Sequence, residues 1–466
     1  MSGADQVGPV VNAWWAGLTG SQVRGWLAQM ERLSGCAAPI FLVGHSIARE
    51  KTSGQVVHVF TSASQPYGRL AVPCRNRRAA VCQPCAFLHH GDTYQLIVSG
   101  LAGGKGVPVS VAEHPRLLVT LTAPSFGPVH RASNPVRSRQ WCRARRTQTV
   151  CEHGVPLVCR TRHPADDPLV GTPLCAACYD YEGAVLWNAN LGELWHRFVL
   201  QVRRELAKSH GLSTTRLSEQ VRVSFAKVAE CQRRGSVHIH AVVRVDGPQG
   251  PGDEPAAWAS AEMLADAVRA AGSAVFVRVL EPDGAGTRVL RFGGQLDVRQ
   301  IGADEESAAV SDQAVAGYVA KYVTKGDLPG LVLPTRLKFE GQIDAAPLSS
   351  HARVLMHMCF QLARRPGLES LRLDRWAHQL GFRGHIATKS RAYSTTYAAL
   401  RSARSEHRRR QAGVTFDPDD VEIVGDWQFD HVGYSPAQAA LAAMIAANTQ
   451  RRRDAGVSRP ATERSP

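Results

Sequence analysis

The chain has 466 residues, 44% of them hydrophobic and 20% charged, which is typical of a soluble protein with two or three packed domains. Lys and Arg total 55 against 40 Asp and Glu, so the net charge of +15 favours a polyanionic partner, above all nucleic acid. No apolar run approaches the roughly 18–20 residues that span a bilayer, and the N-terminus lacks a secretion signal. These features argue against a membrane or secreted protein and predict a cytoplasmic one.

The first part of the chain contains a cysteine motif but little else that can be interpreted. Residues 1–70 have no readable function, although 21–33 has the pattern of a short helix and 56–60 that of a strand. Residues 71–115 place a CxxC between Arg-rich and His-containing flanks and continue as YQLIVSGL, which predicts a metal-bound knuckle leading into a strand. Residues 116–129 begin with RLLVTLT, a strand that Ala-Pro-Ser-Phe-Gly ends.

The middle of the chain combines a Cys-rich insertion with an alternation of strands and helices. Residues 130–182 are basic and turn-rich with little apolar periodicity, so a bound metal is expected to supply their stability. Residues 183–330 predict an α+β fold, an antiparallel sheet with helices on one face. The predicted elements are a helix at 184–210, a hairpin of strands 221–230 and 237–246, a helix at 255–271, strands at 275–280 and 287–299, and a helix at 311–325.

The remaining sequence is predicted to be mainly helical. Within 331–435 the helical patterns cover 348–364, 368–380 and 393–410. Residues 436–466 are predicted to be helical and then disordered.

The clearest chemical motif is His238-Ile239-His240 on the second strand of the hairpin. The period of two puts both imidazoles on one face, which suits chelation of one divalent ion. Glu230 ends the partner strand, and the CQRRGS turn can bring its carboxylate across to the two histidines. This set leaves coordination positions open for a substrate oxygen and water.

A second motif is the sequence GYVAKYVTK within the helix predicted at 311–325. Tyr318 and Tyr322 lie one turn apart on the same face, and Lys321 and Lys325 form a parallel pair beside them. Tyrosine has an ordinary pKa near 10 and is a poor nucleophile unless cations and an activated electrophile assist it. Flanking lysines and a nearby metal would give that assistance.

The 11 cysteines are expected to bind zinc rather than to form disulfides, because their number is odd and most of them cluster between positions 74 and 178. One predicted structural zinc site consists of Cys151, Cys159, Cys175 and Cys178, with His153 as the substitute ligand. A second consists of Cys74, Cys82 and Cys85, with His89, His90 or Cys142 as the fourth ligand.

Arginines near these cysteines are candidates for contacts with DNA phosphates. They are Arg75, Arg77, Arg78, Arg143, Arg145 and Arg146. The basic run at 401–410 is a further candidate, and Trp141 and Tyr393 are candidates for stacking on unpaired bases.

Together these motifs resemble the HUH endonucleases that initiate rolling-circle replication. The HisxHis, an acidic residue eight positions before it and a following tyrosine helix occur in the family's order, and RLLVTLTAPSFG is similar to its first motif. YVAKYVTK resembles the two-tyrosine helix of microviral initiators. The CxxC segment, CxHG…CxxCYDY, AExQRRGxVHxHA and GFRGHIATKSRAYSTT resemble initiators of actinobacterial plasmids and integrative elements over most of 70–435.

The resemblance implies an HUH nuclease core with a ferredoxin-like, split βαβ sheet. It makes His238, His240 and Glu230 ligands of a catalytic Mg²⁺ or Mn²⁺. Tyr318 and Tyr322 become the nucleophiles, with Lys321 and Lys325 on the scissile phosphate. The implied reaction is transesterification at single-stranded or extruded origin DNA, giving a 5′-phosphotyrosyl link and a 3′-OH that primes a host polymerase. The sequence lacks G-x-x-x-x-G-K-[ST], so no nucleotide cofactor is expected and a host helicase would unwind the duplex.

Other classes explain less of the sequence. A zinc-dependent transcription regulator would leave the HxH and the paired tyrosines without a role. A metallohydrolase usually has an Asp two residues beyond the HxH, where this chain has Val242. Conjugative relaxases generally place the tyrosine before the histidines. A two-tyrosine single-strand transposase with a zinc module keeps the observed order and is the main alternative.

Overall fold

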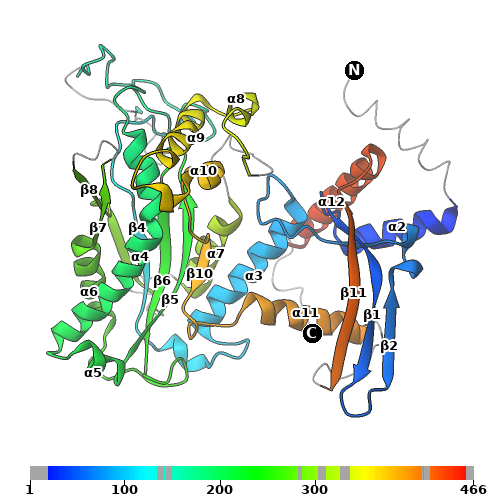
Figure 1. Cartoon of the computed structure of the whole chain (residues 1–466). Helices are drawn as coiled ribbons and strands as arrows, with labels where there is room; N and C mark the ends of the chain where they lie inside the picture. Colours follow the sequence, from blue (N-terminus) through cyan, green and yellow to red (C-terminus); the bar gives the residue numbers. More distant parts are fainter. Residues whose placement is uncertain are drawn as a thin grey trace. The chain divides into compact units, whose positions relative to one another are not determined.

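The computed structural model describes residues 19–133, 141–142, 149–281, 286–302, 311–325, 336–411, 413 and 420–457. The chain divides into two compact units (Figure 1). One unit, the terminal unit, combines Met1–Asp92 with Tyr397–Pro466, and the other, the central unit, is Thr93–Thr396. The first and last parts of the chain therefore fold together.

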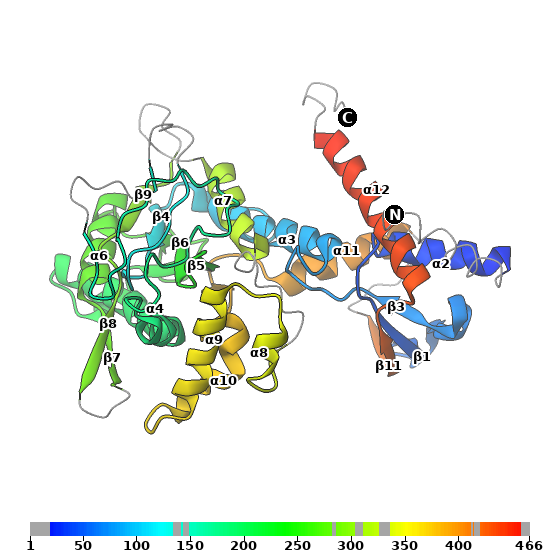
Figure 2. The ribbon, with the colours of Figure 1, turned by 90° about the horizontal axis from the view of Figure 1, so that it is seen from above.

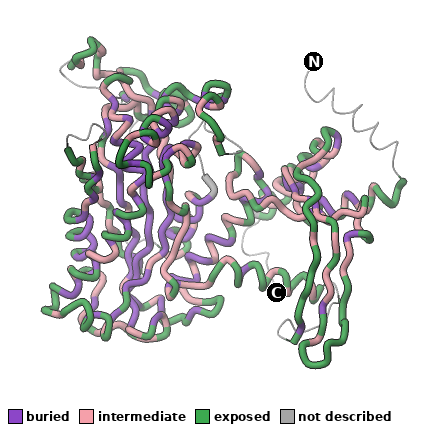
Figure 3. The backbone as a smooth tube through the Cα atoms, viewed as in Figure 1, coloured by how far each residue is buried: buried purple, intermediate pink, exposed green. Residues whose placement is uncertain are grey.

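The central unit is built on a five-stranded antiparallel sheet in the order β10-β5-β6-β4-β9 (Figure 1). Its strands are β4 (Arg116–Leu121), β5 (Arg222–Cys231), β6 (Val237–Asp246), β9 (Leu296–Gln300) and β10 (Ala387–Lys389). Every residue of β6, the middle strand, is buried (Figure 3). The hairpin and the strand expected at 116–122 are confirmed.

Helices cover both faces of this sheet, where the sequence predicted helices on one face only. The helices α4 (Tyr181–Ser209) and α6 (Ala261–Ala274) share a core with Ile239, Ala241 and Val243 of β6. Alternate residues of a strand point to opposite faces, so the even-numbered residues of β6 face the other side. The helix α7 (Asp312–Lys325) lies on that side, and Figure 2 shows α4 and α7 on opposite sides of the sheet.

A buried asparagine of α4 fixes the turn between β5 and β6. Asn188 donates from Nδ2 to the carbonyls of Gly235, at 2.8 Å, and Leu380, at 2.9 Å. Its Oδ1 accepts from the Val237 amide at 3.0 Å, so both N–H donors and the oxygen of the side chain are engaged. The turn also depends on Gly235, whose φ of 82° glycine adopts readily and other residues rarely do. The position of the hairpin end relative to α4 is thereby set.

The rest of the central unit consists of short elements. These are α5 (Thr214–Ser218), β7 (Phe276–Leu280), β8 (Thr287–Arg291), α8 (Gln342–Ala345), α9 (Ser350–Ala363), α10 (Leu373–Trp376), and the 3-10 turns η3 (Val109–Ala112), η4 (Glu369–Leu371) and η5 (Ala377–Gln379). The continuous helix predicted at 368–380 is wrong. The segment breaks into η4, α10 and η5, with Arg372 and Leu380 at left-handed φ values of 46° and 53°.

The segment YQLIVSGL forms part of a helix, α3 (Gln83–Ala102), so the strand predicted there is wrong. A short apolar run does not distinguish a buried helix from a strand by periodicity. Ile97 and Leu101, one helical turn apart, are both almost fully buried. Gly100 of the same helix contacts Tyr393, whose hydroxyl donates to the Ile97 carbonyl at 3.2 Å. Because Tyr393 is fully buried, its predicted role in stacking on bases is also wrong.

The terminal unit has its own antiparallel sheet, in the order β11-β1-β2, with β3 also paired to β1. Its elements are α2 (Gly20–Arg32), β1 (Ile40–Glu50), β2 (Val56–Thr61), the 3-10 turns η1 (Ser62–Ser64) and η2 (Pro66–Gly68), β3 (Leu70–Val72), α11 (Tyr397–Gln411), β11 (Val421–Val432) and α12 (Pro436–Val457). The core of this unit is small and centres on Trp26, Met30 and Phe41.

Strand β11 lies in a region that the sequence predicted to be mainly helical. Its residues are almost all exposed, as Figure 3 shows by colour, so the strand lacks the alternation that marks a half-buried strand. Its antiparallel pairing with β1, from the other end of the chain, makes it a strand. Among the helices that the structure describes, none has the length and apolar character needed to cross a bilayer.

Candidate active site and metal clusters

The two histidines of the HxH motif lie on the face of β6 that α7 covers. Glu230 pairs directly opposite His238 in the β5–β6 ladder, yet its Oε2 lies 3.0 Å from Nε2 of His240. The other ring nitrogen of His240, Nδ1, lies 3.2 Å from the Thr120 hydroxyl on β4. Three strands of the sheet therefore meet at His240, and its ring is held at both nitrogens.

His238 is buried but has an unpartnered nitrogen. Its Nε2 has no hydrogen-bond partner among the described residues. Burial, together with the nearby charge of Arg234, lowers the pKa of His238 to about 3. The imidazole is therefore neutral at physiological pH, the form that donates a lone pair to a metal.

Both tyrosines of α7 contact the His240 ring. The Tyr322 ring stacks on it, with centroids 4.4 Å apart and planes at 13°, and the Tyr318 ring meets it edge-on at 5.2 Å. Burial, hydrogen bonding with Tyr318 and the Glu230 charge raise the pKa of Tyr322 above its ordinary value. Tyr318 is 40% exposed. Lys321 is exposed on the same helix, whereas the Lys325 side chain lies outside the described residues.

The donor set of two imidazoles and a carboxylate fits a divalent transition-metal ion, because imidazole nitrogens suit such ions and the carboxylate adds a hard oxygen donor. His240 and Glu230 are already adjacent. Within the part of the chain that the structure describes, three Cys/His groups have ligand atoms mutually within 4.8 Å, and the set of His238, His240 and Glu230 is not among them. One ion held by all three residues therefore requires their side chains to come closer together than they lie here.

A cavity of about 660 Å³ opens beside these residues. His238 and Glu230 line it, and so do Arg131, Arg233 and Arg234. The Arg234 guanidinium is fixed by donating to the carbonyls of Pro124, at 2.9 Å, and Ala123, at 3.0 Å. The CQRRGS turn was predicted only as a connector of the two strands, and its two arginines were not predicted as site residues. Their position directly between Glu230 and the HxH was the available signal.

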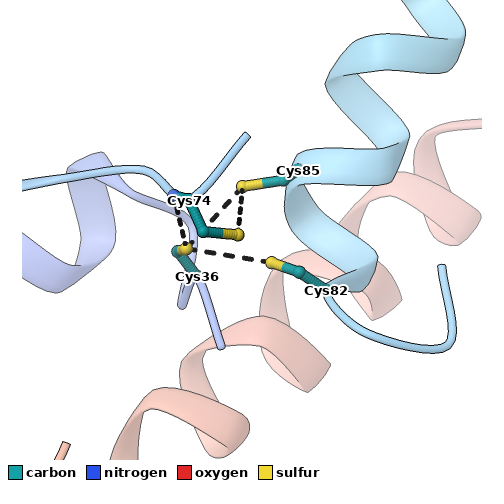
Figure 4. A group of neighbouring side chains, drawn as sticks. All are labelled: Cys36, Cys74, Cys82 and Cys85. Carbon is teal, nitrogen blue, oxygen red and sulfur yellow. Dashed lines mark hydrogen bonds between the residues drawn. The ribbon is translucent and has the colours of Figure 1, made fainter. Parts of the chain in front are cut away.

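One group of cysteines that could hold a metal ion, called the Cys36 cluster, lies in the terminal unit (Figure 4). It consists of Cys36, Cys74, Cys82 and Cys85. The Sγ atom of Cys36 lies 3.8 Å from that of Cys82 and 3.7 Å from that of Cys85. A tetrahedron with zinc–sulfur bonds of about 2.3 Å has edges of about 3.8 Å. The cluster could hold a metal ion, with Cys36 at the fourth position in place of the predicted His89, His90 or Cys142.

Another group that could hold a metal ion, called the Cys151 cluster, lies in the insertion between β4 and α4. It consists of Cys151, His153, Cys175 and Cys178. His153 Nδ1 lies 3.2 Å from the Cys178 Sγ and 3.9 Å from the Cys175 Sγ. The structure groups Cys151, Cys175 and Cys178 with His153, the ligand predicted as the substitute, and places Cys159 in another cluster.

That third cluster, called the His130 cluster, also lies in the insertion. It consists of His130, Cys142, Cys159 and His163.

The predicted DNA-contacting arginines are only partly described. Arg75 is exposed in the terminal unit, and Arg77 and Arg78 are half-buried there. The others lie outside the described residues: Arg143, Arg145 and Arg146. Trp141 is 46% exposed, and the Arg162 guanidinium lies 5.1 Å from the centre of its ring.

Comparison with known proteins identifies relatives over nearly the whole chain. The family model described as the replication initiator protein of pSAM2 matches residues 22–447. A curated replication initiator protein of Streptomyces ambofaciens is 43% identical over 438 residues, which are 92% of this chain and 91% of the relative. No solved structure matches the chain.

Proposed function

The chain belongs to the pSAM2 replication initiator protein family, and from that premise we propose that it nicks one strand of a rolling-circle origin by tyrosine transesterification. The observation that carries the proposal is the contact of His240 with Glu230 on one side and with both tyrosines on the other. Two tyrosine rings, a carboxylate and an imidazole thus meet at one point of the sheet.

In the proposed reaction a tyrosine oxygen attacks a backbone phosphorus. The new bond joins the tyrosine oxygen to phosphorus, the P–O3′ bond breaks, the tyrosine proton leaves, and the released 3′-oxygen takes up a proton. The protein keeps the 5′-phosphate, and the 3′-OH serves a host polymerase as primer. Attack by that or another 3′-OH on the phosphotyrosine reverses the step and rejoins the strand.

The residues around the tyrosines would support this chemistry. His238, His240 and Glu230 would hold Mg²⁺ or Mn²⁺, which stabilises the charge that develops on the phosphate. Lys321, which is exposed and precedes Tyr322 in the sequence, would bind the phosphate, as would Lys325. Tyr318 is the more exposed of the two tyrosines, and the pKa of Tyr322 is raised. We therefore assign the first attack to Tyr318 and the second to Tyr322.

The DNA strand would enter through the cavity beside His238. Its volume, about 660 Å³, accommodates a nucleotide, and its three arginines supply the positive charge that phosphates require. A host helicase would open the duplex. We also propose that the Cys36 and Cys151 clusters bind structural Zn²⁺, because four Cys and His ligands leave no position open for catalysis.

A covalent-adduct assay tests this function. Purified protein is mixed with labelled single-stranded oligonucleotides tiling the DNA around its gene, with Mn²⁺ or EDTA, and resolved on a denaturing gel. The expected result is a metal-dependent adduct that is lost in the double variant of Tyr318→Phe and Tyr322→Phe. Tyr67→Phe is the matched control, since Tyr67 is also 40% exposed and lies outside the site.

Other outcomes would point to other functions. Tight, zinc-dependent binding without any adduct would favour a DNA-binding regulator, for which the three Cys/His clusters are the supporting observation. Adducts only on the ends of a mobile element would favour a two-tyrosine transposase.

A further inference from the structure

The ligands of the two insertion clusters alternate along the chain. In chain order, the pair at 130 and 142 belongs to the His130 cluster and the pair at 151 and 153 to the Cys151 cluster. The pair at 159 and 163 then belongs to the His130 cluster again, and the pair at 175 and 178 to the Cys151 cluster. We propose that the insertion is a cross-braced module with two zinc ions, the additional one bound by the His130 cluster. Each ion would then bind two chain segments that are separated in sequence by ligands of the other ion.

The distances within the His130 cluster suit tetrahedral zinc. The Cys142 Sγ lies 3.7 Å from His130 Nδ1, and the Cys159 Sγ lies 3.4 Å from His163 Nε2. Zinc bonds of about 2.3 Å to sulfur and about 2.0–2.1 Å to nitrogen give a sulfur–nitrogen edge of about 3.5 Å. All four ligand atoms lie within 4.8 Å of one another.

An acidic residue outside the cluster orients one of its histidines. His163 directs Nε2 to the cluster, and its Nδ1 lies 2.8 Å from Oδ2 of Asp167. A carboxylate on the second nitrogen is the common arrangement behind a zinc-bound histidine, because it fixes the tautomer and the direction of the ring. The same Asp167 accepts the Leu169 amide at 2.8 Å, which anchors the carboxylate itself.

The insertion has too little apolar core to fold without such ions. Among the described residues of 149–178, only His163, Gly171 and Cys175 are buried, and two of these three are ligands in the clusters. The structure has no helix or strand between β4 and α4 in the described residues. In a segment of this kind metal binding supplies the folding free energy that a hydrophobic core would otherwise supply.

The His130 cluster also supports one wall of the cavity beside the HxH. Its ligand His130 and the adjacent Arg131 line that cavity together with Glu230 and His238. Arg233 of the hairpin turn, which also lines the cavity, donates to the Asp167 carbonyl at 2.8 Å. If the chain nicks DNA as proposed above, the zinc ion of the His130 cluster positions this wall of the cavity against the incoming DNA strand.

Zinc counting in the full-length protein tests the cross-brace, and the test does not depend on nuclease activity. Native mass spectrometry would give the zinc content of the wild type and of Cys159→Ala, Cys178→Ala, their double variant, and Cys159→Ala with His163→Ala. We expect each single variant to lose one zinc. The double variant of Cys159 and Cys178 should lose two, whereas the double variant of Cys159 and His163 should lose only one.

Two results would overturn the proposal. One is full zinc content in Cys159→Ala. The other is the loss of a single zinc when Cys159 and Cys178 are both replaced, which would mean that they share an ion. Should the alanine variants fail to fold, Cys159→His and His163→Cys keep four ligands and must retain the wild-type count. The affinity for a single-stranded oligonucleotide, measured on the same samples, tests separately whether the His130 cluster positions the cavity wall for DNA.

Discussion

Replacing Asp246 by Asn tests the buried ionic network at the end of β6. Asp246 and Arg244 are both fully buried, and the guanidinium donates to the carboxylate from Nε at 2.6 Å and from Nη2 at 3.0 Å. The Ser224 hydroxyl also donates to it, at 2.6 Å, and His114 Nδ1 lies 2.9 Å away. Asn keeps the shape but leaves the Arg244 charge unpaired in the core.

The expected cost is large because the environment is dry. Removing one partner of a buried, hydrogen-bonded ion pair destabilises a protein by about 3–5 kcal/mol. The Asn amide would in addition point a donor at groups that already donate. Urea unfolding, followed by the fluorescence of the buried Trp187 and Trp195 in the same unit, would measure the change. Asp266→Asn is the control, since that side chain is 81% exposed in its pair with Arg269 and should change stability by about 0.5 kcal/mol or less.

The same variant has a predicted pH signature. Hydrogen bonds from His114 and Arg244 lower the pKa of Asp246, and they outweigh the opposing effect of burial. A carboxyl whose pKa is lower in the folded state contributes stability above its unfolded pKa of about 3.9, and that stability is lost as the pH falls through the folded value. Asp246→Asn should therefore reduce the loss of stability below about pH 4. Two results would refute the tightly coupled network. One is a decrease of less than about 1 kcal/mol in the free energy of unfolding at neutral pH, and the other is an unchanged dependence of stability on pH below about 4.

Two further predictions concern α3 and the Cys36 cluster. Gly100→Ala should destabilise the fold by about 1–3 kcal/mol, because a Cβ there would overlap the Tyr393 ring, whereas Gly91→Ala on the same helix meets no atom within 4 Å and should stabilise it by about 0.5–1 kcal/mol. Thermal melts of the two variants should shift in opposite directions, and equal shifts would contradict the packing argument. Cys36→Ser should remove one zinc and lower the melting temperature, while Cys231→Ser, outside the three clusters, should leave the zinc count unchanged. Retention of all the zinc in Cys36→Ser would show that this thiol is not a ligand.

Local sequence patterns were sufficient to predict the parts of the fold whose signal is local. The β5–β6 hairpin, the strand at 116–121 and the helix that carries the tyrosines could be predicted because hydrophobic periodicity and turn residues act over a few positions. The same patterns placed His238 and His240 on one face of a strand. They also brought Glu230 into reach, since a hairpin turn determines which residues face each other.

Only the tertiary structure decided which distant residues meet. Cys36 precedes Cys74 by 38 positions and has no motif of its own, so its place as fourth ligand depends on the path of the chain. The exchange of Cys159 for His153 has the same cause, because the spacings alone permit several groupings. Strand β11 exists through its pairing with β1, a long-range contact that leaves no periodicity behind. Local sequence patterns predict helices, strands and turns, because backbone sterics and periodicity act over a few residues. The pairing of distant segments depends on the packing of the whole chain.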